Sequence, residues 1–150
     1  QRRMDRLAKW IAAVILAITG AGGAFGQILK ASPMADFIET TLSGLNLGIL
    51  LPFIISAALK TAQGSSTVAI ITTSSIMAPI IGSLGLSPAL TVLAIGSGSM
   101  VVSHANDSYF WVVSKFSDME VNTAYKAYTT ATLVEGIVGF AGVAIVSIFV

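Results

Sequence analysis

The chain has 150 residues, of which 55% are hydrophobic and 10% are charged, and its net charge is +1. Ordinary soluble domains carry about 25% charged residues, so this composition lacks the charge that covers a globular surface and predicts a membrane protein. The charged residues form no basic stripe, which argues against a nucleic-acid partner. The lack of cysteine excludes disulfides and thiolate metal sites.

The first predicted element is a hydrophobic stretch over residues 7–30. About 20 apolar residues cross the hydrocarbon core of a bilayer, and residues 10–29 form an uncharged run of this length. Cationic residues cluster immediately before it, at Arg2, Arg3, Arg6 and Lys9. The positive-inside rule therefore predicts that the Gln1 end is cytoplasmic, and we expect further residues before Gln1.

Glycine interrupts this first stretch. Four glycines occur between residues 20 and 26, and each costs roughly 1 kcal/mol relative to alanine inside a helix. We therefore expect a break in the helix over 19–27, in which Gly22 and Gly23 face a substrate. Close packing of helices against these glycines is the alternative interpretation.

The second and third hydrophobic stretches, over 45–60 and 66–86, are separated by a polar segment at 63–67. The pattern fits two short helices with a loop, and it also fits one helix that is unwound in the middle. Three hydroxyl residues follow Gly64 in this segment: Ser65, Ser66 and Thr67. One of them is expected to cap the next helix, and the others remain free to hydrogen-bond a carboxylate or polyhydroxylated ligand.

A polar cluster over 96–108 breaks the fourth hydrophobic stretch, which covers 88–113 and begins with a proline suited to a helix start. No Asp, Glu, Lys or Arg occurs in the 46 residues from Thr61 to Asn106, and Asp107 ends this run. An ionisable residue in so apolar a sequence indicates a functional site.

The same cluster holds the only histidine of the chain, His104. Histidine exchanges a proton near neutral pH, so His104 is a candidate proton carrier, and a neutral histidine hydrogen-bonded in a loop is the simpler interpretation. Asp107 also has simpler interpretations, as the N-cap of a helix over 108–114 or as an acid at the surface. The apolar residues that follow it at 109–113 favour an environment in which protonation depends on occupancy.

The fifth stretch, over 124–150, carries Gly136, Gly139 and Gly142 at a spacing of three. This spacing puts small residues near one face, where they allow helices to pack closely. Glu135 lies in the same stretch, either as a proton carrier or as an acid that faces a neighbouring helix.

The three polar breaks, at 19–27, 63–67 and 96–108, predict a shared cavity. Unpaired backbone polar groups in hydrocarbon cost several kcal/mol each, so non-helical backbone persists at depth only where protein buries it or where it lines a cavity. Broken helices that face one another build the midplane sites of many secondary transporters. Exposed N–H groups at the start of a half-helix favour a bound anion.

Enzyme and cofactor patterns are missing from the sequence. Ser103, His104 and Asp107 lie within five positions and have no nucleophile elbow, so the pattern excludes a Ser-His-Asp hydrolase. The glycines at 20–26 do not fit a dinucleotide-binding loop, and residues 64–67 lack the lysine of a P-loop. We therefore expect no enzymatic activity, no cofactor and no metal.

Several segments resemble the gluconate permease (GntP) family of sugar-acid:proton symporters. They are ITGAGGAFGQIL at 18–29, QGSSTVAIITT at 63–73, LAIGSGS at 93–99 and SHANDSYFW at 103–111. The family pattern often reads Gly-Ser-Ala-Thr-Val where this chain has Ser66 in the third place, and Ser-His-Val-Asn-Asp where it has Ala105. The order and spacing of these segments resemble the C-terminal third of such a permease.

The resemblance implies a much longer permease with inverted repeats of the ion-transporter-superfamily type. In this interpretation the chain is an all-α polytopic membrane protein with broken or re-entrant helices. Residues 1–150 form a single transmembrane domain, which is the C-terminal repeat and works with the N-terminal half of the same permease. The resemblance also implies uptake of a sugar acid with a proton across a bacterial inner membrane. The partners that it implies are the lipid bilayer and other copies of the permease in a homo-oligomer.

The predicted substrate site combines the three breaks: Gly22, Gly23, Gly64, Ser65, Ser66, Thr67, Ser103, Asn106 and Asp107. His104 and Asp107 are predicted to couple occupancy to protonation. A sodium-coupled carrier or a cation:proton antiporter of the same superfamily is the alternative within transport, and a structural membrane subunit is the alternative outside it. Gluconate, idonate, glycerate and D-serine all remain candidate substrates.

Overall fold

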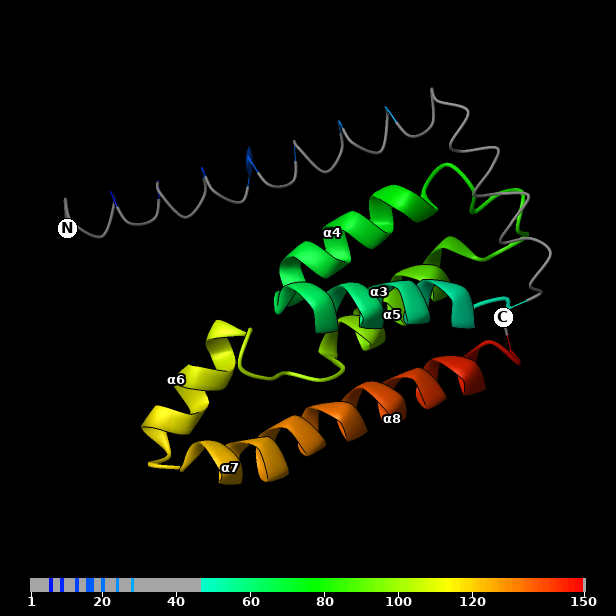
Figure 1. The fold of residues 1–150 in the computed structure, drawn as a ribbon. Helices are drawn as coiled ribbons and strands as arrows, with labels where there is room; N and C mark the ends of the chain where they lie inside the picture. Colours follow the sequence, from blue (N-terminus) through cyan, green and yellow to red (C-terminus); the bar gives the residue numbers. More distant parts are fainter. Residues whose placement is uncertain are drawn as a thin grey trace.

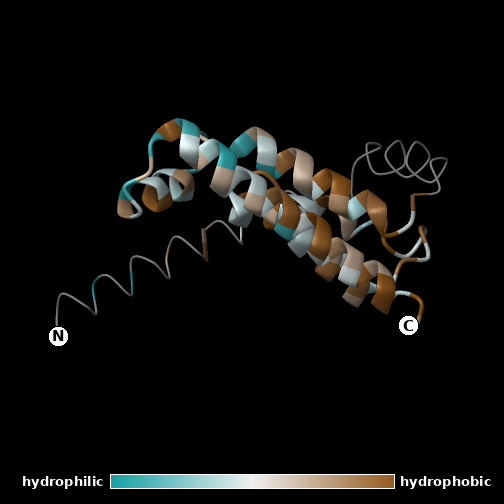
Figure 2. Ribbon diagram, turned by 90° about the horizontal axis from the view of Figure 1, so that it is seen from below, coloured by the Kyte–Doolittle hydropathy of each residue, from teal (hydrophilic) through white to brown (hydrophobic). Residues whose placement is uncertain are grey.

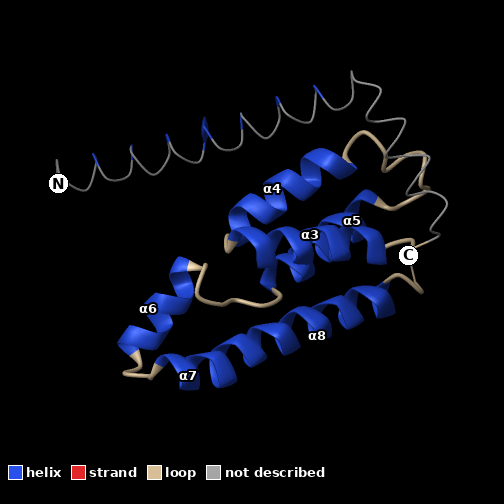
Figure 3. Ribbon diagram, viewed as in Figure 1, coloured by secondary structure: helices blue, strands red, loops and turns tan. Residues whose placement is uncertain are grey.

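The computed structural model describes residues 47–149 and eight isolated positions nearer the N-terminus, at 6, 9, 13, 16, 17, 20, 24 and 28. These residues are helical or lie in turns and loops, and the described part of the chain has no strand (Figure 3). The elements are α3 (Leu50–Gln63), α4 (Ser66–Met77), α5 (Pro88–Met100), α6 (Ser108–Phe116), α7 (Val121–Ala124), the π-helical turn η1 (Tyr125–Thr129) and α8 (Thr130–Val146) (Figure 1). The predicted all-α character is therefore confirmed for this part.

Helices α3 and α4 form a hairpin. Leu51 at the start of α3 packs in one apolar cluster with Met77 at the end of α4, so the two arms run antiparallel. Ile95 of α5 completes this cluster. Of the two interpretations of the 63–67 break, two short helices with a loop is correct, and one helix unwound in the middle is wrong.

The turn at the tip of the hairpin is formed by Gly64 and Ser65. Gly64 takes a left-handed conformation with a φ of 71°, and its N–H donates to the Lys60 carbonyl, which ends α3. The Ser65 hydroxyl then accepts a hydrogen bond from the Val68 N–H, which starts α4. Ser65 is therefore the expected helix cap.

Helix α5 contacts both arms of the hairpin and α8 (Figure 1). Pro88 lies in its first turn, as predicted. The Ser56 hydroxyl of α3 donates to the Ile95 carbonyl at 2.7 Å, and Gly98 lies so close to α3 that a Cβ there would overlap the Phe53 carbonyl. Because α5 stops at Met100 and α6 starts at Ser108, the predicted break in the fourth stretch is present over 101–107. The predicted bounds of 96–108 are wrong for 96–100, which continue α5 as helix.

The last helix is continuous from Val121 to Val146 through η1. Its 26 residues are apolar enough to cross a membrane, and at 1.5 Å per residue they extend about 39 Å. Leu50–Gln63, Ser66–Met77 and Pro88–Met100 are apolar but shorter. Figure 2 shows hydrophobic residues along much of these helices, with hydrophilic residues gathered where α6 passes into α7.

Glycines of α8 permit its close contact with α5. A Cβ on Gly136 would overlap the Val101 side chain, and a Cβ on Gly139 would lie 3.1 Å from the Ser97 hydroxyl. Gly142 has open space around it. The predicted small-residue face is therefore confirmed for the first two glycines and is wrong for the third. Gly142 is exposed, whereas the next residue, Val143, packs against Leu90 and Ala94 of α5, because a spacing of three drifts around a helix of 3.6 residues per turn.

This difference gives a matched pair of substitutions. We expect Gly136→Ala to lower the stability of the full-length permease by about 1–3 kcal/mol, since overpacking forces a shift between α5 and α8. Gly142→Ala is expected to be neutral or slightly stabilising, because alanine favours the helix and meets nothing. Thermal unfolding of both variants in detergent checks this, and equal effects at the two positions would contradict it.

The break predicted over 19–27 is not seen at the two positions described there. Gly20 and Ala24 are helical. Glycine lowers helix stability by roughly 1 kcal/mol relative to alanine but does not forbid the conformation, so a helical Gly20 is compatible with its sequence. The other positions of the predicted break lie outside the described residues, Gly22 and Gly23 among them.

Candidate functional site

A cavity of about 340 Å³ lies at the tip of the α3–α4 hairpin, where the breaks at 64–65 and 101–107 come together. It receives side chains from the last turn of α3, the first turns of α4 and α6, the 101–107 segment, η1 and α8. Six of the predicted site residues line it: Gly64, Ser65, Ser66, Thr67, Ser103 and Asp107. The structure thus brings two of the three predicted breaks into one site.

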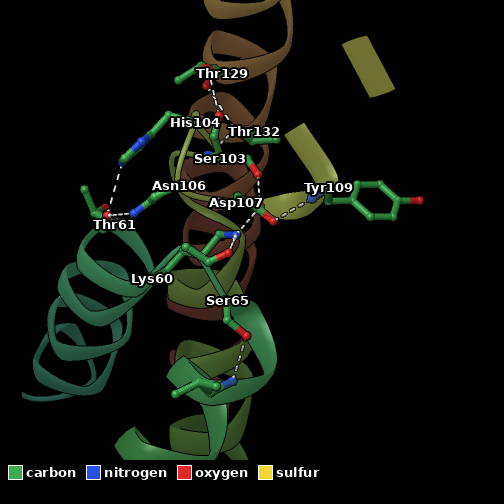
Figure 4. A network of polar contacts seen from close by, with 12 residues as sticks. Lys60, Thr61, Ser65, Ser103, His104, Asn106, Asp107, Tyr109, Thr129 and Thr132 are labelled. Carbon is green, nitrogen blue, oxygen red and sulfur yellow. Dashed lines mark hydrogen bonds and ion pairs between the residues drawn. The ribbon is translucent and has the colours of Figure 1, made fainter. Parts of the chain in front are cut away.

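A buried ion pair forms the polar centre of this cavity. The Lys60 ammonium lies 2.5 Å from Asp107 Oδ2, and the two residues are only 2% and 7% exposed. The Ser103 hydroxyl donates to the same Oδ2, and Oδ1 accepts the Tyr109 N–H at 2.9 Å (Figure 4). Asp107 is therefore the N-cap of α6 and a buried counter-ion at once. Its interpretation as an acid at the surface is wrong.

The loop that carries Ser103 is held against the last helix by two threonines. The Ser103 N–H donates to the Thr132 hydroxyl at 3.0 Å, and the Ser103 carbonyl accepts the Thr129 hydroxyl at 2.7 Å. Both polar groups of this non-helical backbone are thereby satisfied, as an apolar environment requires. The neighbouring Val102 has a φ of 49°, a strained conformation for a β-branched residue, and such strain persists only where surrounding contacts fix it.

His104 and Asn106 lie beside the cavity and do not line it. The Asn106 amide donates to the carbonyls of Thr61 at 2.8 Å and Ala62 at 3.3 Å, which are free because α3 ends there. His104 Nε2 lies 3.1 Å from the same Thr61 carbonyl and must be its donor, since a carbonyl only accepts. Both side chains therefore fasten the 101–107 segment to the end of α3.

Lys60 is the charged site residue that the sequence analysis missed. It closes α3 at one end of the charge-free run, and Asp107 stands at the other end. Ionisable residues in apolar surroundings pair with one another, so the two charges that bracket a run without others were candidates for an ion pair. This bracketing was the available signal.

An aromatic cluster supports the wall opposite the hairpin. The fully buried Phe110 of α6 stacks against Tyr125 of η1 with ring centroids 5.0 Å apart, and Tyr128 lies at 6.3 Å. The wider turn of a π-helix, a feature frequent at functional sites, carries both tyrosines. Glu135, which the sequence singled out as an acid in the last helix, also lines the cavity. Further lining residues that the sequence did not single out are Met100, Ser108, Tyr109, Tyr128 and Thr132.

The groups that line this cavity can bind a small polar ligand. Its lining contains one cation, Lys60, two acids, Asp107 and Glu135, and several hydroxyl groups. It also contains the Ser66 and Thr67 N–H groups, which precede the first intrahelical hydrogen bond of α4. The positive end of a helix dipole favours an anion at this point. Among the described residues no group of three His, Asp or Glu side chains lies together to hold a metal.

Comparison with known proteins gives a consistent result. A family model of GntP family permeases matches residues 3–149. The chain is 39% identical to the D-serine transporter DsdX of Escherichia coli (strain K12) over 138 residues, which cover 91% of this chain and 31% of that protein. It is 37% identical to the high-affinity gluconate transporter of the same strain, over 88% of this chain and 30% of that protein.

The Gnt-II system L-idonate transporter of Escherichia coli (strain K12) is 37% identical over 132 residues, which cover 87% of this chain and 30% of that protein. The chain thus spans about a third of the length of these curated relatives. No solved structure matches it significantly. Permeases are membrane transporters and not enzymes, which agrees with both expectations from the sequence. The family match and the relatives together confirm the resemblance: the chain belongs to the GntP family of permeases.

Proposed function

We propose that the full-length permease takes up a small hydroxylated carboxylate, such as gluconate or a related sugar acid, together with a proton across the bacterial inner membrane. Residues 1–150 form one transmembrane domain, the C-terminal repeat, which acts with the N-terminal half of the same permease. The Gln1 end is cytoplasmic in this arrangement.

The observation that carries this proposal is the convergence of anion-binding groups in one cavity. Lys60 supplies a positive charge, and the start of α4 supplies N–H groups and the hydroxyls of Ser65, Ser66 and Thr67. A cavity of about 340 Å³ lies within the usual range of small-molecule sites. A carboxylate fits the charge and the N–H groups, and substrate hydroxyls fit the serine and threonine side chains.

The relatives support the same ligand class. Their names give D-serine, gluconate and L-idonate as transported molecules. Each of these molecules has one carboxylate and at least one hydroxyl group. The shared chemistry is therefore the one that this cavity offers, and the differences between the molecules lie beyond the carboxylate.

The lengths of the helices support a re-entrant arrangement of the ion-transporter-superfamily type. With 14 and 12 residues, α3 and α4 extend about 21 and 18 Å, less than the roughly 30 Å of the hydrocarbon core. We assign the hairpin as re-entrant, with its tip near the midplane. Gly22 and Gly23 face the same site from the first break. Asn106 ties the loop to the hairpin, and His104 and Asp107 are the candidate proton carriers.

Transport assays on the reconstituted full-length permease test this function. We expect labelled gluconate to accumulate in proteoliposomes under an inward proton gradient without sodium. D-serine, L-idonate or glycerate should compete, and glucitol, which lacks the carboxylate, should not. Accumulation on a sodium gradient alone would instead favour the sodium-coupled alternative, and no accumulation under either gradient would overturn the proposed transport.

A further inference from the structure

We infer that Lys60 binds the carboxylate of the substrate. In the empty site Lys60 is paired with Asp107, and Asp107 gives up this ion pair when it takes up the transported proton. This inference rests on the proposed uptake of an organic anion and names the residues that couple it to a proton. The ion pair is thus a switch between two partners of one cation.

The contacts of Lys60 fit an exchange of partners. Its ammonium has three donors, of which one serves Asp107 Oδ2 and a second points to the Gly64 carbonyl at 3.5 Å. The third donor has no acceptor among the described residues, and Lys60 lines the cavity that a ligand would enter. A carboxylate in the cavity therefore reaches the same charge that Asp107 neutralises in the empty site.

Charge balance makes protonation the trigger. With Asp107 ionised, the pair is neutral and offers an incoming anion little electrostatic attraction. With Asp107 protonated, Lys60 is a nearly fully buried cation without a counter-ion, which is a costly state that a bound anion relieves. The proton and the anion therefore enter together, and the loaded site carries the same net charge as the empty one.

The surroundings of Asp107 suit both of its charge states. When it is ionised, Oδ2 accepts from Lys60 and Ser103, and Oδ1 accepts from the Tyr109 N–H. When it is protonated on Oδ2, its O–H donates to the Ser103 hydroxyl, which turns from donor to acceptor. One ion pair breaks, one O–H bond forms on Asp107, and a new ion pair forms between Lys60 and the substrate.

The other titratable groups at the cavity come from three elements. Tyr109 belongs to α6, Tyr128 to η1 and Glu135 to α8, and all three line the cavity with the pair. Neither tyrosine hydroxyl is hydrogen-bonded to Asp107, although the Tyr128 hydroxyl interacts with the Ser103 hydroxyl. Glu135 forms no ion pair with Lys60 in the described part of the chain. His104 is engaged with the Thr61 carbonyl outside the lining. Asp107 is therefore the group whose protonation changes the partner of Lys60.

Variants of the full-length permease test each half of this switch. Lys60→Gln is expected to weaken gluconate binding about 100-fold, as loss of a buried charge partner does, while Lys60→Arg retains binding. Asp107→Asn is expected to bind gluconate equally well at acidic and neutral pH and to exchange it across the membrane, without accumulating it on a proton gradient. Wild-type binding should strengthen as the pH falls. In thermal shift assays, gluconate should stabilise Asp107→Asn more than wild type, because it supplies the missing anion.

Two control variants separate loss of the Lys60–substrate contact from general loss of charge or of folding. Lys115→Gln removes an exposed cation outside the cavity and should bind gluconate as wild type does. The double variant Lys60→Gln/Asp107→Asn has no buried charge, so it should fold and still fail to bind gluconate. Wild-type affinity in this double variant or in Lys60→Gln, or proton-driven accumulation by Asp107→Asn, would overturn the inference alone. Failure of the wild-type permease to take up gluconate, D-serine or L-idonate would overturn the proposed function and the inference with it.

Discussion

Asp107→Ala is expected to destabilise the full-length permease by about 3–5 kcal/mol, because it leaves the Lys60 ammonium buried without its counter-ion. The same substitution removes the cap that accepts the Tyr109 N–H at the start of α6, which adds about 1 kcal/mol. Thermal unfolding in detergent should therefore show a large fall in Tm, and transport should be lost.

A double variant separates the buried charge from the lost contacts. Lys60→Met/Asp107→Ala contains neither charge, so we expect it to regain most of the lost stability while transport remains absent. Glu120→Ala is the matched acid-to-alanine control, since Glu120 is exposed and makes no side-chain cap hydrogen bond at α7. If the double variant were as unstable as Asp107→Ala, the unpaired charge would not be the cause.

The local elements of this fold could be predicted from short patterns. The break at 63–67 follows from glycine beside hydroxyl residues, and Ser65 is the cap because its side chain reaches the N–H of the first turn. Pro88 starts α5 for an equally local reason, its fixed φ. The direction of the chain at the break could not be predicted, because it depends on packing between distant residues such as Leu51 and Met77.

The candidate site was predictable in part for a related reason. Asp107 stands out from the sequence because an acid in apolar surroundings is costly, and the serine and threonine residues at the tip follow from the broken helix. Lys60 was treated as the end of a hydrophobic stretch, although it is the counter-ion that stabilises the buried Asp107 carboxylate. His104 was chosen for its acid–base chemistry, whereas its contact with Thr61 is set by where α3 ends.

The second large effect is expected at Gly64, the residue at the tip of the hairpin. A Cβ there would overlap the Asn106 carbonyl and approach its side chain, and the left-handed φ of 71° is strained for any other residue. Gly64→Ala should therefore push the 101–107 segment away from the hairpin. Because that segment carries Asp107, the substitution should separate Asp107 from Lys60 and abolish transport.

Gly48→Ala isolates the backbone contribution to this effect. Gly48 also has a positive φ, of 52°, but a Cβ there meets nothing within 4 Å. This variant should cost about 1–2 kcal/mol from the left-handed conformation alone and leave transport intact. Stability measurements together with gluconate uptake in both variants therefore distinguish strain from collision. Similar losses at Gly48 and Gly64 would mean that strain is the whole cause, whereas loss of uptake at Gly64 alone would show that the close approach of hairpin and loop builds the site.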